Sequence, residues 1–327
     1  KGDDVFILDN AIDDEQQEKR AESYQQNDIV DQFLIHVPIQ LGLDKNEVKM
    51  GFRWKNHRIE GFYTILVDKD IKFHEKEVNF KKGDQVCALL AGGGYAERVS
   101  VPSGQVLKAP KGFSFEQAAA LPEVFATAYF NLYMEASLSE GEKALIHAGA
   151  SGVGTAAIQI CKAKGNPCFV TAGTKEKISR CVELGADDGT IRNEERFLQA
   201  VNNWTDEKGV EVILDPVGAN YLEDNLKSLA LEGRLVMIGL MGGAQSSVNL
   251  GLLMMKRLRI IGSTLRAQPI AKKTEIMNNL KENIWPSLES GDIKPIIDTV
   301  IPIEEVDKAH KLMESNQTFG KVILKVS

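Results

Sequence analysis

The sequence of 327 residues contains only four cysteines, and they are not arranged to bind a metal. Cys87, Cys161, Cys168 and Cys181 stand singly, with no C-x-x-C pair and no cluster of cysteine and histidine at the spacing of metal ligands. We expect four reduced thiols that pack in the core, because cysteine without a low-pKa environment behaves as a small apolar residue. The sequence therefore predicts no metal site.

Long apolar runs are absent as well. The most apolar stretch, residues 235–255, is interrupted by glycine, glutamine, serine and asparagine. A membrane-spanning helix needs about 18 or more consecutive apolar residues. The printed sequence also begins at Lys1 without a basic and then apolar leader. We expect a cytoplasmic protein that does not bind membranes.

An excess of positive charge is the third feature that the sequence lacks. The formal net charge is -7, and residues 1–31 account for all of it. The acidic residues of this stretch, which outnumber Lys1, Lys19 and Arg20, are Asp3, Asp4, Asp9, Asp13, Asp14, Glu15, Glu18, Glu22, Asp28 and Asp31. We interpret the stretch as a solvated face or a mobile end. Because nucleic acids and anionic membranes select basic surfaces, we expect neither as a partner.

The chain has enough apolar side chains, 43% of its residues, to build a sizeable core. Residues 144–262 alternate short apolar runs with helical patterns, which is typical of βαβ units. This predicts an α/β fold with a doubly wound parallel sheet of about six strands, the Rossmann arrangement. The strands are expected at 144–148, 168–171, near 190, 210–214, 235–238 and 258–261, and the helices at 155–163, 176–184, 197–204 and 221–230.

The flanking regions read mostly as β structure. Residues 85–90 and 96–101 are expected to be strands joined through the AGGG turn at 91–94. Downstream, we expect a helix over 304–314 and a terminal strand over 321–326 that returns to the sheet of the first domain.

The clearest motif is HAGASGVG at 147–154, directly after an expected strand and directly before an expected helix. Gly149 and Gly152 would let the backbone approach a pyrophosphate, and Gly154 would let the helix pack closely on the strand. Ser151 takes the place of the middle glycine of G-x-G-x-x-G, so the motif is a variant. The alternative is a tight turn without a ligand.

The end of the second expected strand bears on the choice of cofactor. NAD enzymes commonly place an acidic residue there, and this chain has VTAGTKEK at 170–177 instead. Gly173 and Thr174 would lie at the adenosine ribose, and Lys175 or Lys177 together with Arg192 would meet a 2′-phosphate. We therefore expect NADPH rather than NADH. The alternative is an exposed lysine at a helix start and a solvated loop arginine.

Two further strand ends are candidates for the nicotinamide, because open α/β sheets bind ligands at the carboxyl ends of their strands. Gly239, Leu240 and Met241 begin a glycine-rich loop that runs to Gly243 after the fifth strand. Ser263, Thr264 and Leu265 end the sixth. Either could be a plain turn.

Several ordered blocks together resemble a known family. They are LLAGGGYAERVSVP (89–102), QAAALPEVFATAYF (117–130), the 144–160 block, LALEGRLVMIGLMGG (229–243) and AHKLMESNQTFGKVIL (309–324). Over roughly residues 80–327 the chain resembles the zinc-independent quinone oxidoreductases of the medium-chain dehydrogenase/reductase superfamily. It is most similar to the p53-inducible branch, whose relatives include zeta-crystallin.

The resemblance implies a GroES-like catalytic domain (1–116 and 267–327) and a Rossmann domain (117–266), with NADPH in the cleft between them. It also implies a homodimer formed by edge-to-edge extension of the Rossmann sheets. In the family pattern Thr127 lies near the nicotinamide ribose. Other positions take the pyrophosphate or the 2′-phosphate ribose: Ala150, Ser151, Gly152 and Val153 for the first, Gly173, Lys177 and Arg192 for the second. Arg192 stands where the family usually has tyrosine.

The first 80 residues depart from the family pattern, and they include the segments that would line the substrate. We single out Tyr63 and His57 as polar aromatic candidates there, and packing is the favoured role for each. The sequence therefore identifies no catalytic residue.

The reaction implied is metal-free hydride transfer from NADPH to a small quinone or activated enone, which is already electrophilic. One alternative is an enoyl reductase that acts on an α,β-unsaturated carbonyl or thioester. Another is a protein that binds NADPH without catalysis, as the crystallin relatives suggest.

Overall fold

The computed structural model describes residues 65–67, 80, 83–96, 99, 101–192 and 196–326. Its largest element is a six-stranded sheet with the order β6-β5-β4-β7-β8-β9, in which all neighbours are parallel. The strands are β4 (Ala144–Ile146), β5 (Cys168–Ala172), β6 (Asp188–Ile191), β7 (Val210–Asp215), β8 (Leu229–Met237) and β9 (Arg259–Gly262). The predicted doubly wound α/β fold is confirmed.

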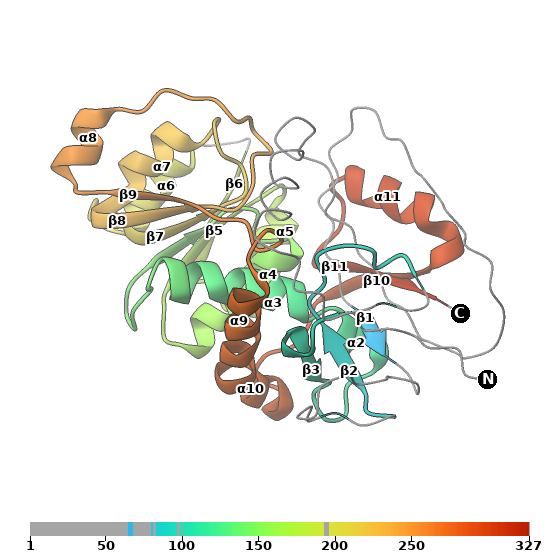
Figure 1. Cartoon of the computed structure of the whole chain (residues 1–327). Coiled ribbons are helices and arrows are strands. Elements are labelled where there is room, and N and C mark those ends of the chain that lie inside the picture. The colour runs from blue at the N-terminus through green and yellow to red at the C-terminus, as the bar shows by residue number, and fades with distance from the viewer. Residues whose placement is uncertain are drawn as a thin grey trace, which may run out of the picture.

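Helices cover both faces of this sheet, with α6 and α7 above it and α3 and α4 below it in Figure 1. Alternation along the strands explains the two layers, because successive side chains point to opposite faces. Ala144 and Ile146 belong to one buried cluster, and Leu145 belongs to the other. The helices are α3 (Pro122–Tyr129), α4 (Gly152–Ala163), α5 (Lys175–Leu184), α6 (Phe197–Trp204), α7 (Leu222–Ser228) and α8 (Leu250–Met255).

The helix expected at 221–230 is shorter in the structure than in the prediction. In the structure α7 ends at Ser228, and Leu229 already begins β8. The pairing of β8 with β7 shifts register after Leu229, and Glu232 adopts a positive φ of 63° within the shifted segment. A short apolar run such as LAL fits a helix end and a strand start equally well, so the pattern alone does not place this boundary.

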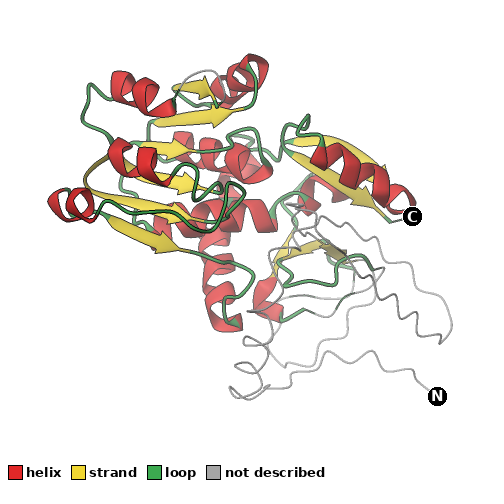
Figure 2. Cartoon of the chain, turned by 90° about the horizontal axis from the view of Figure 1, so that it is seen from above, coloured by secondary structure: helices red, strands yellow, loops and turns green. Residues whose placement is uncertain are grey.

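The remaining described residues form two small sheets and more helices. The strands β1 (Ile65–Val67), β2 (Val86–Ala88) and β3 (Val106–Lys108) are antiparallel, whereas β10 (Ile297–Pro302) and β11 (Lys321–Lys325) are parallel. Figure 2 shows the β10–β11 pair and α11 beside the six-stranded sheet and separate from it. The helices are α2 (Phe115–Ala119), α9 (Ile270–Asn283), α10 (Trp285–Ser290), α11 (Val306–Glu314), the π-helix η2 (Phe130–Glu135) and the 3-10 turns η1 (Ser103–Gln105) and η3 (Ile303–Glu305).

Two expectations for these regions are wrong. Ala96, Val99 and Val101, the described residues of the strand expected at 96–101, are not in a strand, and β3 pairs with β2 instead. The final strand β11 pairs with β10 rather than with β1–β3. It still packs against the first region, because Ile323 shares a buried cluster with Val86. The boundaries that separate 1–116 and 267–327 from 117–266 stay a prediction.

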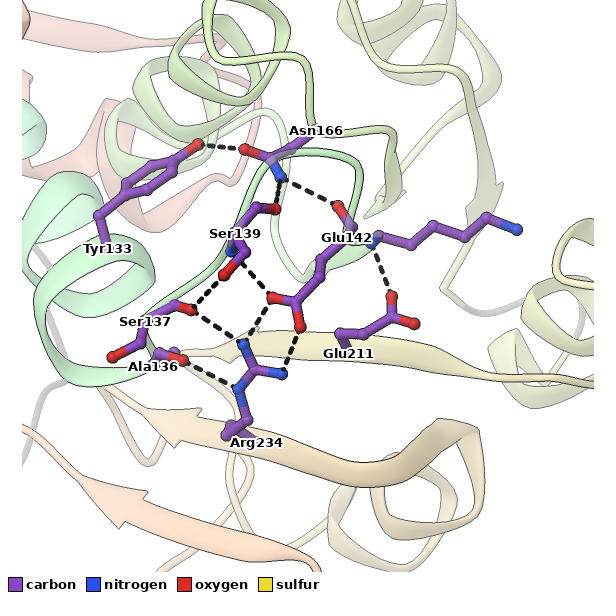
Figure 3. Close-up of polar contacts among 9 residues, drawn as sticks. Tyr133, Ala136, Ser137, Ser139, Glu142, Asn166, Glu211 and Arg234 are labelled. Atoms are coloured by element: carbon purple, nitrogen blue, oxygen red, sulfur yellow. Dashed lines mark hydrogen bonds and ion pairs between the residues drawn. The ribbon is translucent and has the colours of Figure 1, made fainter.

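A buried arginine holds the amino-terminal side of the six-stranded sheet together (Figure 3). From β8, Arg234 reaches the connection between η2 and β4, where its Nη1 and Nη2 donate to the two carboxylate oxygens of Glu142 at 3.1 and 2.6 Å. Its Nε and Nη2 also donate to the carbonyls of Ala136 and Ser137 at 2.8 and 3.1 Å. This arginine therefore fixes the connection to the sheet at the end opposite to the strand ends considered below.

Candidate functional site

The loop between β4 and α4 carries the predicted phosphate-binding motif at the point where the strand order reverses, between β4 and β7. Ser151 is the N-cap of α4, and its Oγ accepts a hydrogen bond from the Gly154 amide at 3.0 Å. The amide of Val153 has no acceptor among the described residues. A free amide at the N-terminus of a 12-residue helix offers a donor and a positive dipole end to a phosphate.

The three glycines of this loop all pack closely against protein, and for Gly154 this agrees with the predicted close packing of helix on strand. A Cβ on Gly149 would lie 2.9 Å from the Val170 side chain of β5, so this glycine permits close packing on the sheet. A Cβ on Gly152 would lie 2.7 Å from Lys321 and 3.0 Å from Val124. A Cβ on Gly154 would clash with the preceding turn of the same loop. The motif forms a tight turn from strand to helix, and its role in binding a pyrophosphate stays a prediction.

A cluster of positive charges lies beyond the end of β5. Thr174 caps α5 by accepting from the Lys177 amide at 3.2 Å, and a Cβ on Gly173 would meet nothing within 4 Å. The Lys177 ammonium donates to the Asn316 carbonyl at 2.7 Å. Burial lowers its pKa, and the nearby charge of Arg192 lowers it further. The structure thus brings Lys177 and Arg192 together beside an open position.

Arg180 is a third cation of this cluster, which the sequence analysis missed. Its charge also lowers the pKa of Lys177, and its guanidinium stacks on the Phe319 ring at 3.8 Å from the ring centroid. The spacing of three residues from Lys177 on one helix was the available signal. The carboxylate of Asp298 raises the pKa of Lys177 and so offsets part of the repulsion among these cations, and an anion that binds among them would relieve the rest.

The loops after β7 and β8 interlock. The Met241 and Gly242 amides donate to the Pro216 and Val217 carbonyls at 3.2 and 2.7 Å, and a Cβ on Gly239 would lie 2.8 Å from the Pro216 oxygen. The predicted nicotinamide loop, in which Leu240 is 36% exposed, is therefore fixed in place by the loop after β7.

After β9, the Ser263 amide donates to the Met237 carbonyl at 2.9 Å. The Ser263 hydroxyl is buried and has no hydrogen-bond partner within the described part of the chain. Leu265 is buried and Thr264 is exposed. Ser263 and Leu265 thus lie at the carboxyl edge of the sheet, as predicted, together with the loops after β4, β5, β7 and β8.

A buried polar network beneath these loops was not predicted. The ring of His147 lies 2.7 Å (Nε2) from Asn225 Oδ1 and 3.0 Å (Nδ1) from Thr171 Oγ1. Asn225 Nδ2 donates to Asp215 Oδ2 at 2.9 Å, and the other Asp215 oxygen accepts from the Val217 amide at 2.6 Å. The network therefore connects the ends of β4, β5 and β7.

Burial sets the charge of this network. It lowers the pKa of His147 to about 4, so the imidazole is neutral near pH 7. Burial also raises the pKa of Asp215 to about 6, against the effect of its hydrogen-bond donors. With a neutral ring and an acceptor at Asn225 Oδ1, Nε2 carries the hydrogen and Nδ1 accepts from Thr171.

Thr127 lies on α3, where its Oγ1 donates to Glu123 Oε1 at 3.0 Å. Tyr63 and His57 fall outside the described residues. All four cysteines are free and buried. In the described part of the chain, no three His, Cys, Asp or Glu side chains gather as metal ligands, and no helix has the length and apolar character needed to cross a membrane. The donor set for a zinc ion is therefore not assembled by these residues.

Comparisons with known proteins agree with this geometry. Residues 152–282 match the family model described as zinc-binding dehydrogenase. Human quinone oxidoreductase is 32% identical over 247 residues, which cover 75% of this chain and 73% of that protein. The Escherichia coli quinone oxidoreductase complexed with NADPH has a TM-score of 0.67 and 29% identity, and the match covers 75% of this chain and 76% of that one.

Lovastatin diketide synthase lovF of Aspergillus terreus is 29% identical over 316 residues, which cover 94% of this chain. The chain spans only 13% of that much longer protein. The human and bacterial quinone oxidoreductases, by contrast, are matched over about three quarters of their own length. Together with the sheet and the loop between β4 and α4, these matches show that the chain belongs to the quinone oxidoreductase type of the medium-chain dehydrogenase/reductase superfamily.

Proposed function

We propose that the protein reduces a small quinone by hydride transfer from NADPH without a metal. The observation that carries the choice of NADPH is the cluster of Lys177, Arg180 and Arg192, in which Lys177 and Arg180 lie on the helix that begins just after the open position at Gly173. This cluster suits a phosphate dianion on the adenosine ribose, whereas NADH places only hydroxyls there. The similarity to quinone oxidoreductases supports the substrate class.

When bound, NADPH supplies the hydride, and the residues of this chain bind and orient it. The α4 N-terminus, with the free Val153 amide and its neighbours Ala150, Ser151 and Gly152, would hold the pyrophosphate. Gly173, Thr174, Lys177 and Arg192 would hold the 2′-phosphate ribose. Thr127 would contact the nicotinamide ribose. The loop residues Gly239, Leu240, Met241, Ser263 and Leu265 would line the nicotinamide.

Reduction of a quinone needs no Lewis acid, because its conjugated carbonyl is already electrophilic. The reduced product then needs only a proton from water or from one hydroxyl. A simple ketone or aldehyde would need its carbonyl polarised by a metal or a strong donor. The protein is therefore expected to prefer quinones to simple carbonyl compounds.

An enoyl reductase is the second candidate, and one specific observation favours it. The match to lovastatin diketide synthase covers 94% of this chain, so it extends into the first 80 residues, whereas the match to human quinone oxidoreductase covers 75%. These 80 residues would line the substrate in the proposed arrangement. The cofactor site would be the same for both substrates.

We also infer a cytoplasmic homodimer, with the edge strand β9 as the contact. In the six-stranded sheet β9 pairs only with β8. The neighbouring helix α8 exposes Leu250, Met254 and Met255 at 70, 75 and 77% of their surfaces. Exposed apolar side chains next to an unpaired strand edge favour a protein contact there.

The direct test is to follow oxidation of NADPH and of NADH by absorbance, with ortho-quinones, small enones and an α,β-unsaturated thioester as acceptors. Turnover of quinones with NADPH supports the main proposal. Turnover of the thioester alone transfers the support to the enoyl reductase. No turnover of any acceptor while NADPH still binds overturns both.

Substitution of Lys177 tests the choice of cofactor. We expect Lys177→Ala to raise the KM for NADPH by about 10- to 100-fold, the loss of one charge-assisted phosphate contact, and to leave the KM for NADH nearly unchanged. Lys175→Ala is the matched control, because Lys175 is exposed on the same helix and does not contribute to the pKa shift of Lys177. An equal effect of Lys177→Ala on both cofactors would contradict the assignment.

A further inference from the structure

Three buried polar side chains follow one another along α3 and η2, four residues apart. Glu123, Thr127 and Asn131 are 9, 6 and 1% exposed. Thr127 Oγ1 donates to Glu123 Oε1 at 3.0 Å, and Asn131 Nδ2 donates to the Thr127 carbonyl at 2.7 Å. We call these residues the polar ladder. Residues four apart share one face of a helix, so the ladder presents a continuous polar face.

Two oxygen atoms of the polar ladder have no hydrogen-bond partner among the residues that the structure describes. They are Glu123 Oε2 and Asn131 Oδ1. A buried acceptor that makes no hydrogen bond loses the hydration it has in the unfolded chain and gains nothing in return. The ladder therefore has unused acceptors that suit a ligand with hydrogen-bond donors.

The Glu123 end of the polar ladder lies near the loop between β4 and α4. Gly152, the first residue of α4, packs so closely against Val124 and Lys321 that a Cβ there would lie 3.0 and 2.7 Å from them. Val124 follows Glu123 directly in the chain, and the charge of Lys321 lowers the pKa of Glu123. Glu123 is therefore next in the chain to a residue that contacts Gly152, and its carboxyl group is affected by the charge of Lys321, whose side chain also contacts Gly152.

The direction of the hydrogen bond from Thr127 limits what this residue can do. A threonine hydroxyl has one hydrogen, and here it is given to Glu123. Toward any further partner Thr127 then offers only lone pairs. Such an acceptor fits the hydroxyl groups of a ribose, which donate hydrogens, and does not fit the oxygens of a phosphate.

We propose that Glu123 is a positioning residue of the cofactor site: it holds the Thr127 hydroxyl as an acceptor for a hydroxyl of the nicotinamide ribose, and its own Oε2 accepts a second donor there. This inference rests on the proposed NADPH function. It assigns a role to a carboxyl group that neither the hydride transfer nor the 2′-phosphate site uses.

The ionisation of Glu123 provides an independent readout. Burial raises its pKa to about 7, against the effects of the Lys321 charge from β11 and the Thr127 hydroxyl on its own helix. Lys294, from the segment before β10, lines the same small hollow beside Gly152 as Lys321. Below this pKa the unpartnered Oε2 takes up the proton, so it becomes a donor and no longer accepts the second hydrogen bond from the ribose. Binding of the nicotinamide half should therefore weaken as the pH falls through 7.

The test compares two ligands on the full chain, NADPH and 2′,5′-ADP, which lacks the nicotinamide ribose. We expect Glu123→Gln to raise the Kd of NADPH about tenfold and to leave the Kd of 2′,5′-ADP unchanged. Thr127→Val should do the same, and Thr127→Ser should restore binding. Glu116→Gln is the matched control, because Glu116 is also a helical carboxylate and pairs with Lys325 of β11 at 3.0 Å.

The same ligands measured at pH 6 and pH 8 complete the test. In the wild type the Kd ratio of NADPH to 2′,5′-ADP should fall between pH 6 and pH 8 by several-fold more than in Glu123→Gln. Equal losses for both ligands, or no loss for either, would overturn the role of Glu123. Failure of the wild type to bind either ligand would instead overturn the proposed NADPH function.

Discussion

His147 shows how one side chain connects three strand ends beneath the loops at the carboxyl edge of the sheet. Its ring contacts Asn225 and Thr171, and through Asn225 it reaches Asp215 at the end of β7. A charged imidazole in this position would lose its acceptor role toward Thr171 and would be buried without a carboxylate in direct contact. The neutral ring is thus required by the network.

This requirement predicts a pH-dependent contribution to stability. Burial lowers the pKa of His147 from 6.5 to about 4, so the unfolded chain takes up the proton first as the pH falls. The contribution is complete above pH 6.5 and is lost toward pH 4. At pH 5 the free energy of unfolding should lose about 2 kcal/mol relative to pH 7.5 on account of this residue.

The measurement is urea unfolding of the wild type and of His147→Gln at both pH values. Asp215 and Glu123 have raised pKa values and change stability in the opposite direction, so the contribution of His147 is the difference between the two proteins. His310→Gln serves as the control, because that ring is partly exposed and contacts Tyr95. Identical pH dependence in wild type and His147→Gln would contradict the prediction.

For single residues, the sequence predicts roles that neighbouring residues determine. It does not predict roles that depend on partners far away in the chain. The turn HAGASGVG is specified by eight neighbouring residues. Its Ser151 caps α4 by accepting a hydrogen bond from the Gly154 amide, as serine at an N-cap usually does. His147 belongs to the same motif, but its partner Asn225 is 78 residues away. Glu123 lies inside a block recognised by similarity, and nothing in the block shows that its carboxyl group is buried.

Among the elements, Arg234 connects β8 to the segment between η2 and β4. The guanidinium group of Arg234 donates hydrogen bonds to both carboxylate oxygens of Glu142 and to two backbone carbonyls. Asn166 supports the same segment by donating to the Ser139 and Glu142 carbonyls at 2.6 and 3.1 Å (Figure 3). The loop entering the central strand β4 is therefore held by side chains rather than by strand pairing.

Replacement of the Arg234 guanidinium group is expected to lower the stability of the protein measurably. Arg234→Lys keeps the charge but cannot make the paired bonds, so we expect the free energy of unfolding to fall by about 2–3 kcal/mol. Arg257→Lys is the control, since Arg257 pairs with Glu232 on the exposed surface and should change stability by at most about 0.5 kcal/mol. Similar losses for both variants in chemical denaturation would contradict the role of Arg234.

The elements of the six-stranded sheet were predictable because strands and helices alternate with clear punctuation, such as Gly185, which ends α5. The elements outside it were harder. The segment at 96–101 has alternating apolar residues, yet β2 takes β3 as its partner. The π-helix η2 has no sequence signature, because its wider turn depends on how the neighbouring elements pack.

For the whole molecule, the open edge of the sheet predicts association. We expect a dimer in sedimentation equilibrium, and we expect Met254→Lys combined with Met255→Lys to yield a monomer, because charges on a desolvated contact are costly. Val182→Lys is the control, since Val182 is 42% exposed on α5, away from β9. A monomeric wild type, or a double variant that stays dimeric, would show that this edge is not the interface.

The overall architecture was predictable as a sheet domain with a second region, but how the two regions join was not. The tail was expected to return to the first sheet, and instead Gly320 lies against the loop between β4 and α4, where its amide donates to the Ala150 carbonyl at 2.8 Å. This contact joins residues 170 positions apart, a distance over which patterns in a single sequence carry no information.

The Gly320 contact has a consequence for the order in which the protein matures during synthesis. A growing chain emerges from its amino-terminal side, so all strands of the six-stranded sheet are made before Gly320 and Lys321. The strands of the six-stranded sheet can therefore pair while the loop between β4 and α4 still lacks the segment that packs against Gly152. Nascent chains that end before residue 320 would thus have a complete sheet whose loop between β4 and α4 lacks this contact, and we expect a ligand of that loop to bind tightly only after the last strand docks.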